Sequence, residues 1–132
     1  MGANEAQNVS TIQRGFEAFA KGDIETLKTL FSPNARWDQA QTGILRGNYR
    51  GVQAILEFFR QLAHETEGAL RAEPLTMAGS GNHVFVFERV TGTRKGKTLD
   101  TKEALVFKLA NGIVTEVTEL QSAHPTVAKF WS

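Results

Sequence analysis

The first half of the chain carries its apolar residues at helical spacing. Residues 9–21 and 52–64 each repeat apolar side chains every three or four positions, which predicts two amphipathic helices. Ser10 and Gln13 form the pattern of a capping box, which predicts that the first helix begins there. A short additional helix is expected after Asp23, an N-cap residue that follows the helix-ending Gly22.

The second half alternates apolar and polar residues, as strands do. One short strand is expected before the last of these helices and four longer ones after it, over residues 35–40, 69–78, 83–93, 98–109 and 113–121. Residues 43–51 are expected to form a loop. The terminal pair Phe130 and Trp131 is expected to dock on the protein, because adjacent exposed aromatics are unfavourable.

This order of elements predicts an α+β fold. Helices grouped in the N-terminal half, followed by hairpin-connected strands, should cover one face of a bent antiparallel sheet. A curved sheet covered in this way encloses a pocket of the kind that binds small molecules. The 132 residues suit one domain spanning 1–132.

Composition narrows the possible chemistry. The chain has no cysteine, which excludes thiol nucleophiles and thiolate metal sites. Fifteen Lys and Arg against fourteen Asp and Glu, scattered along the chain, argue against nucleic-acid binding. The three histidines lack metal-ligand spacing and no glycine loop opens a helix, so neither a metal nor a cofactor is expected. Without a leader-like or membrane-length apolar run, a cytoplasmic protein with no membrane contact is expected.

Several stretches resemble one family across essentially the whole chain. They are KGD at 21–23, LFSPNARW at 30–37, RGNYRGVQAILEFFRQL at 46–62 and ANGIVTEVTEL at 110–120. In order and spacing the chain resembles the nuclear transport factor two-like superfamily, closest to its SnoaL-like and ketosteroid-isomerase-like branch. The resemblance implies a cone-shaped curved antiparallel sheet with three covering helices. This fold hosts isomerases, cyclases, hydrolases, dehydratases and non-catalytic proteins, so it does not settle the function.

The resemblance to ketosteroid isomerases does not extend to their catalytic residues. The positions of the oxyanion-hole tyrosine, the aspartate base and the protonated aspartate of that family read Gly15, Gln39 and Leu105 here. Steroid isomerisation by that mechanism is therefore not expected.

Two other branches match in part. The limonene epoxide hydrolases carry an aromatic and an amide two residues apart on the first strand, which match Trp37 and Gln39. Their Arg-Val-Asp stretch resembles Arg89 to Thr91, with threonine replacing the aspartate, and their second aspartate falls near Ser122. SnoaL-type cyclases place an aspartate late in the last strand, where Glu119 is the nearby carboxylate.

Alternation along the strands sorts the candidate residues onto faces. Asp38 lies on the face opposite Trp37 and Gln39, so it is expected to point outward and to pair with a lysine or arginine. On residues 83–91 both faces are largely apolar. We expect the face carrying Phe87, Arg89 and Thr91 to line the pocket.

Arg89 and the two carboxylates each allow two interpretations. Arg89 is either half of a cross-strand ion pair or a cation that holds a ligand. Glu103 shares a face with Leu105 and Phe107, so it is either an acid–base group with a raised pKa or a strand-end residue that pairs with Arg89 or a lysine. For Glu119 the pattern leaves open which face is inward.

These observations give two functional hypotheses. The first is an isomerase, cyclase or epoxide hydrolase acting on an apolar carbonyl or epoxide compound. Its catalytic residues are Arg89, Glu103 and Glu119, and its binding residues are Trp37, Gln39, Phe16, Phe59, Phe87 and Thr91. The second is a non-catalytic ligand-binding or dimerisation module. A homodimer is expected through the outer face of the sheet, with Val84, Val86 and Val90 in the interface.

Overall fold

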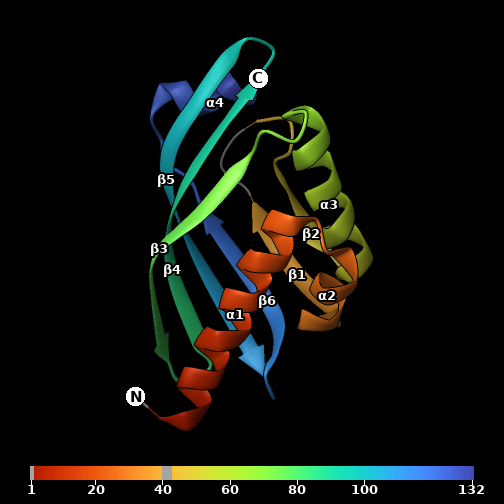
Figure 1. The fold of residues 1–132 in the computed structure, drawn as a ribbon, viewed down its shortest axis with the longest axis vertical. Helices are drawn as coiled ribbons and strands as arrows, with labels where there is room; N and C mark the ends of the chain where they lie inside the picture. The colour runs from red at the N-terminus through yellow and green to blue at the C-terminus, as the bar shows by residue number, and fades with distance from the viewer. Residues whose placement is uncertain (1, 40–42) are drawn as a thin grey trace.

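The sheet and helices form the α+β arrangement that the sequence predicts. The computed structural model describes residues 2–39 and 43–132. In chain order the elements are α1 (Ala3–Lys21), α2 (Ile24–Leu30), β1 (Phe31–Gln39), β2 (Gly47–Arg50), α3 (Val52–Glu65), β3 (Arg71–Ser80), β4 (His83–Arg94), β5 (Lys97–Ala110), β6 (Ile113–Leu120) and α4 (Pro125–Phe130). Helices α1, α2 and α3 cover one face of the curved sheet, and α4 packs beside β5 (Figure 1).

The sheet is mixed rather than purely antiparallel. Its strand order is β2-β1-β6-β5-β4-β3. Three hairpin-like connections make β3, β4, β5 and β6 antiparallel neighbours, whereas β1 runs parallel to β6. Alternation predicts the hairpins but carries no information about the edge on which β1 docks. The antiparallel expectation is therefore wrong for this one pair.

The first helix begins earlier than the capping-box pattern predicts. It starts at Ala3, and Ser10 lies inside it on the exposed side. The Glu5 carboxylate accepts from the Gly2 N–H at 2.9 Å and from the Gly81 N–H at 3.2 Å. This second bond ties the first turn to the β3–β4 hairpin, a tertiary contact that extends the helix beyond its local signal. The predicted N-cap at Asp23 is confirmed, since its side chain accepts from the Thr26 N–H.

Strand β2 occupies part of the stretch expected to be a loop. It is four residues long and pairs with β1, placing Tyr49 opposite Trp37. The Tyr49 ring stacks on Phe58 with 4.4 Å between centroids. A strand this short, between glycines, does not show a recognisable alternation of apolar and polar residues. It is held by pairing with β1 and by packing against α3.

The core lies between the concave face of the sheet and helices α1, α2 and α3. Helix α3 buries Ile55, Phe58 and Phe59 against it. The Trp37 indole meets the rings of Phe59 and Phe107 edge to face, at 5.2 and 6.2 Å between centroids. Such pairs add to the stabilisation that comes from burying their area.

The C-terminal aromatics dock as expected. Phe130 and Trp131 are 1% and 4% exposed. The buried Arg94 side chain donates to the Phe130 carbonyl at 3.1 Å and the Ser132 carbonyl at 2.8 Å, and it pairs with Glu65 at 2.9 Å. One arginine on β4 thus holds both the end of α3 and the end of the chain.

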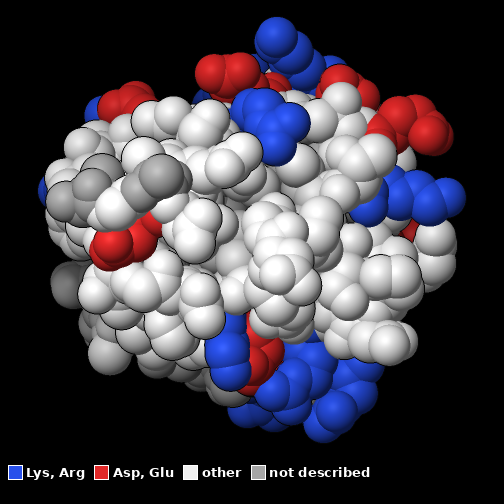
Figure 2. Space-filling view, turned by 90° about the horizontal axis from the view of Figure 1, so that it is seen from below, with Lys and Arg blue, Asp and Glu red and all other residues white. Residues whose placement is uncertain are grey.

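Acidic and basic side chains are intermixed, so neither sign of charge dominates. The end of the molecule seen from below carries acidic and basic side chains mostly around its border (Figure 2). Among the described helices, none has the length and apolar character required to cross a bilayer.

We expect Arg94→Ala to lower the free energy of unfolding by about 2–4 kcal/mol, because it leaves Glu65 and two carbonyls without their buried donor. Urea denaturation followed by circular dichroism measures this. The control is Arg60→Ala, which breaks an exposed ion pair with Glu57 and should leave stability nearly unchanged. Equal effects of the two substitutions would contradict the role given to Arg94.

Candidate active site

A largely apolar cavity lies between the sheet and helices α1, α2 and α3. Its volume is about 100 Å³. Seven aromatic side chains form much of its wall: Phe16, Phe19, Phe31, Trp37, Phe59, Phe107 and Trp131. Such a wall repels water and weakens the screening of any charge inside.

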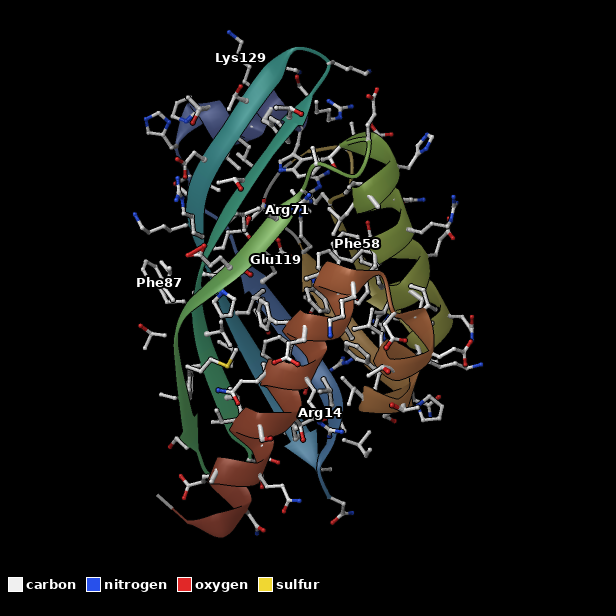
Figure 3. The ribbon with its side chains drawn as sticks, in the orientation of Figure 1. Arg14, Phe58, Arg71, Phe87, Glu119 and Lys129 are labelled. Atoms are coloured by element: carbon white, nitrogen blue, oxygen red, sulfur yellow. The ribbon has the colours of Figure 1, made fainter. Side chains whose placement is uncertain are left out.

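Three carboxyl groups from adjacent strands line the same cavity. Glu88 comes from β4, Glu103 from β5 and Glu119 from β6. The β4–β5 register places Glu88 directly opposite Glu103, and the β5–β6 register places Glu119 opposite Leu105, one step along the same face from Glu103. We call Glu88, Glu103 and Glu119 the carboxyl cluster. Figure 3 shows Glu119 between the sheet and helix α1.

Burial raises the pKa of every member of the carboxyl cluster. The pKa of Glu88 rises to about 7, chiefly through loss of water, with a smaller contribution from the charge of Glu119. Burial and the neighbouring charge of Glu88 raise the pKa of Glu103 to about 8. Burial and Glu103 raise the pKa of Glu119 well above its ordinary range. Carboxyl groups this close in an apolar cavity cannot all be ionised at neutral pH.

Hydrogen bonds join the cluster into a chain. Glu119 is bonded to Glu103, and Glu103 to Glu88. A hydrogen bond between two carboxyl groups requires a proton on one of them. The cluster therefore carries fewer negative charges than carboxyl groups at neutral pH, as the raised pKa values of all three members indicate.

Two further polar groups touch this chain. The Trp37 indole N–H donates to Oε1 of Glu119 at 2.9 Å. Because Trp37 is wedged among aromatic rings, this bond fixes the orientation of the Glu119 carboxyl. The Gln121 amide hydrogen-bonds to Glu103 and Glu119 and lowers the pKa of both.

Gln39 adds an amide to the cavity wall. It is 3% exposed, and its Oε1 atom has no hydrogen-bond partner among the described residues. A buried carbonyl oxygen without a donor is unfavourable unless a ligand or water supplies one.

The structure brings together six of the predicted site residues. Trp37, Gln39, Phe16, Phe59, Glu103 and Glu119 all line the cavity. Asp38 lies on the other face of β1, as expected, but its expected partner is missing. Its Oδ1 atom is buried without a hydrogen bond among the described residues, and no ion pair to a lysine or arginine is found there.

The prediction of which face of β4 lines the pocket is wrong. Arg89, Phe87 and Thr91 are absent from the cavity wall. Phe87 is 46% exposed, and its side chain points away from the helices (Figure 3). The ion-pair interpretation of Arg89 holds, with Asp100 as partner rather than Glu103, through bonds of 2.9 and 2.8 Å. Both faces of β4 carry apolar residues. Alternation therefore separates the residues onto two faces but does not show which face points inward.

The expected outer valines are consequently inside. Val84, Val86 and Val90 are buried, and Val90 lines the cavity.

The sequence analysis missed Glu88 and Gln121. A signal for Glu88 was present, because counting outward from the turn at Lys95-Gly96 pairs Glu88 with Glu103. Gln121 follows the end of β6, and alternation places it on the face of Glu119 without showing that this face is inward. Within residues 2–39 and 43–132 no His, Asp or Glu group has the geometry of a metal site.

Comparison with known proteins identifies the family. A family model described as "SnoaL-like domain" matches residues 12–117. The chain belongs to the SnoaL-like domain family, which confirms the resemblance drawn from its motifs.

Individual relatives agree with this assignment. Bal32a, from a soil-derived mobile gene cassette, is 33% identical with a TM-score of 0.93, covering 97% of this chain and 98% of that one. The uncharacterized protein Rv0034 of Mycobacterium tuberculosis is 25% identical over 95% of this chain and 96% of its own length. A putative SnoaL-like polyketide cyclase from Jannaschia sp. CCS1 shares the fold, with 22% identity, a TM-score of 0.86 and coverage of 100% and 96%.

We expect stability to fall as pH rises from about 5 to 8. The folded pKa of Glu103, about 8, exceeds its ordinary value of 4.5, so the folded state binds more protons between these pH values. The stabilisation is complete below 4.5 and is lost as pH rises through 8, at up to about 1.4 kcal/mol per pH unit for each such carboxyl.

Glu103→Gln, which removes the titrating group, should flatten this dependence, whereas the exposed Glu73→Gln should not. Urea denaturation at several pH values measures both. A slope that Glu103→Gln leaves unchanged would mean that Glu103 does not hold its proton.

Proposed function

We propose that the chain is an acid–base enzyme that needs no cofactor and acts on a small, mainly apolar compound with a carbonyl or epoxide oxygen. The observation that carries this proposal is the carboxyl cluster at the polar side of an apolar cavity. It combines neutral carboxylic acids with an ionised carboxylate near neutral pH. General acid–base catalysis needs both at once.

Each carboxyl has a distinct role in this proposal. Glu119, oriented by Trp37, turns its O–H from the cluster to the substrate oxygen and stabilises the negative charge that develops there. Glu88 removes a proton from the carbon next to the carbonyl. Glu103 connects the two and shares the proton along the chain. Return of the proton to a different carbon completes an isomerisation with no net change in atoms or electrons.

The same cluster suits an epoxide substrate. There, a neutral carboxyl protonates the epoxide oxygen while the ionised one takes a proton from the attacking water. The partial match of Trp37 and Gln39 to the epoxide hydrolase branch supports this variant. The fold of the Jannaschia protein, described as a putative polyketide cyclase, supports a carbonyl substrate instead.

Variants of the cluster test the proposal. Exchange of the α-hydrogens of 1-indanone with D₂O, followed by proton NMR, reports proton removal beside a carbonyl, and hydrolysis of styrene oxide reports the epoxide reaction. We expect Glu88→Gln, Glu103→Gln and Glu119→Gln each to slow the active reaction about 100-fold or more, because each interrupts the proton chain. Glu73→Gln, on the exposed side of β3, is the matched control.

Unchanged rates in all three variants would rule out carboxyl catalysis. A pocket that binds 1-indanone equally well in every variant without turning it over would favour the alternative, a ligand-binding module of the same fold.

We further propose that the protein is a homodimer joined through the outer face of the sheet. Phe87, Ala104 and Leu120 stand side by side on β4, β5 and β6, and Phe85 and Val106 form the next row. We call these five residues the outer patch. Phe85, Phe87 and Leu120 are 47%, 46% and 44% exposed. Large apolar side chains grouped on a sheet face mark an interaction surface.

A charge placed in the outer patch should separate the subunits. We expect Phe87→Lys to shift the protein from dimer to monomer at micromolar concentration, measured by sedimentation velocity. Gln13→Lys, on the exposed side of α1, adds the same charge and should leave the dimer intact. A wild-type chain that sediments as a monomer would exclude this interface.

A further inference from the structure

A surface groove adjoins the cavity. It is bounded by the end of α1, the start of α2, helix α3 and the beginning of β3, and its volume is about 400 Å³. It shares five lining residues with the cavity: Phe19, Leu27, Phe59, Leu70 and Ala72. These shared side chains form the partition between the two spaces.

The sizes of the two spaces suggest that a ligand uses both. Sites for small molecules usually enclose about 300–1,000 Å³. The groove, at about 400 Å³, lies within this range, but the cavity, at about 100 Å³, is smaller, so a ligand of ordinary size that reaches the cavity must extend beyond it. Rotation of Phe19 or Leu70, both only partly buried, would join them.

The groove and the cavity have opposite electrostatic character. Lys21, Arg60 and Arg71 line the groove, and no Asp or Glu is among its described lining residues. Arg60 is already paired with Glu57, which lies outside the groove lining. Lys21 and Arg71 therefore supply most of the available positive charge.

Hydrogen bonds restrain the guanidinium group of Arg71. One of its terminal nitrogens donates to the Gly68 carbonyl at 2.8 Å and the Leu70 carbonyl at 2.9 Å. Its other terminal nitrogen has no hydrogen-bond partner within residues 2–39 and 43–132. Figure 3 shows Arg71 at the beginning of β3, the strand that borders the groove. A fixed guanidinium is well suited to binding a carboxylate.

We propose that this groove is the entrance of the cavity and that Lys21 and Arg71 bind the carboxylate of an amphipathic ligand whose apolar end enters the cavity. The carboxyl cluster repels an anion from the inner end, and the two cations attract it at the outer end. A ligand satisfies both conditions only when its carboxylate lies in the groove and its apolar end lies in the cavity. The inference rests on the proposed function in one respect: this ligand would be the substrate, with its reactive carbon toward Glu88, Glu103 and Glu119.

Three probes of similar shape separate charge from hydrophobicity: 4-phenylbutanoate, 4-phenylbutanol and 4-phenylbutylamine. Their binding to the full chain is followed by tryptophan fluorescence, since Trp37 and Trp131 both line the cavity. We expect the carboxylate to bind about fivefold more tightly than the alcohol, the upper end of what a partly exposed ion pair provides, and more tightly than the amine. Added salt should reduce the difference.

Variants that remove one positive charge show which side chains bind the carboxylate. Lys21→Gln and Arg71→Gln should each weaken 4-phenylbutanoate binding about two- to fivefold and leave 4-phenylbutanol binding unchanged. Lys28→Gln, on the exposed side of α2 outside the groove, removes the same charge and should leave all three affinities unchanged. Thermal unfolding confirms that the variants are folded.

Other outcomes would overturn the proposal. Equal affinity for the three probes, preference for the amine, or an equal effect of Lys28→Gln would each show that the groove does not select a carboxylate. These results are independent of catalysis. If the carboxylate is not preferred but turnover still depends on the carboxyl cluster, only the proposed entrance is rejected. If the carboxylate is preferred but turnover does not depend on the carboxyl cluster, only the proposed enzymatic function is rejected.

Discussion

The burial of three carboxyl groups in an apolar cavity is the constraint on which the rest of the site depends. No lysine or arginine is among the described residues that line the cavity. An isolated ionised carboxylate in such surroundings is strongly unfavourable. The cluster avoids that penalty by retaining protons, so its members bind one another instead of repelling. Burial first, and their proximity second, therefore keep the acidic side chains partly protonated.

That state requires accurate positioning by several elements. Each carboxyl stands on a different strand, and the strand register holds them in one line across the concave face. Strand β1 contributes the Trp37 hydrogen bond from the other side of β6. Helices α1 and α3 contribute Phe16, Phe19 and Phe59 to the aromatic wall that excludes water. A side chain on a loop would not supply the same precision, because loops are more mobile than paired strands.

Much of the fold and part of the site follow from the sequence. Gly22 and Asp23 predict the break between the first two helices, and alternation predicts the long hairpins. The family resemblance placed Trp37 and Gln39 on the pocket side. Alternation placed Glu103 on the face of Leu105 and Phe107 without deciding between its two interpretations. On strand β4 the two faces looked alike, since phenylalanines on one face matched valines on the other. The inward face was decided by packing against α1, which the local pattern does not contain.

The family resemblance also misled at this strand. Matching Arg89 to Thr91 with a catalytic stretch favoured the face that the structure leaves exposed, and it drew attention away from Glu88. A register argument from the Lys95-Gly96 turn would have been independent of the family and would have paired Glu88 with Glu103. Short-range geometry was the better guide where the functional residues of relatives differ.

The parallel junction of β1 and β6 has a consequence for the order in which the molecule forms. Trp37 and Glu119 are separated by 82 residues along the chain, and β1 and β6 are neighbours in the middle of the sheet. Closing so long a loop is entropically costly, whereas the hairpins from β3 to β6 close locally. We therefore expect the hairpins to form early and β1 to join them late. The indole–carboxyl contact then marks the final stage of folding.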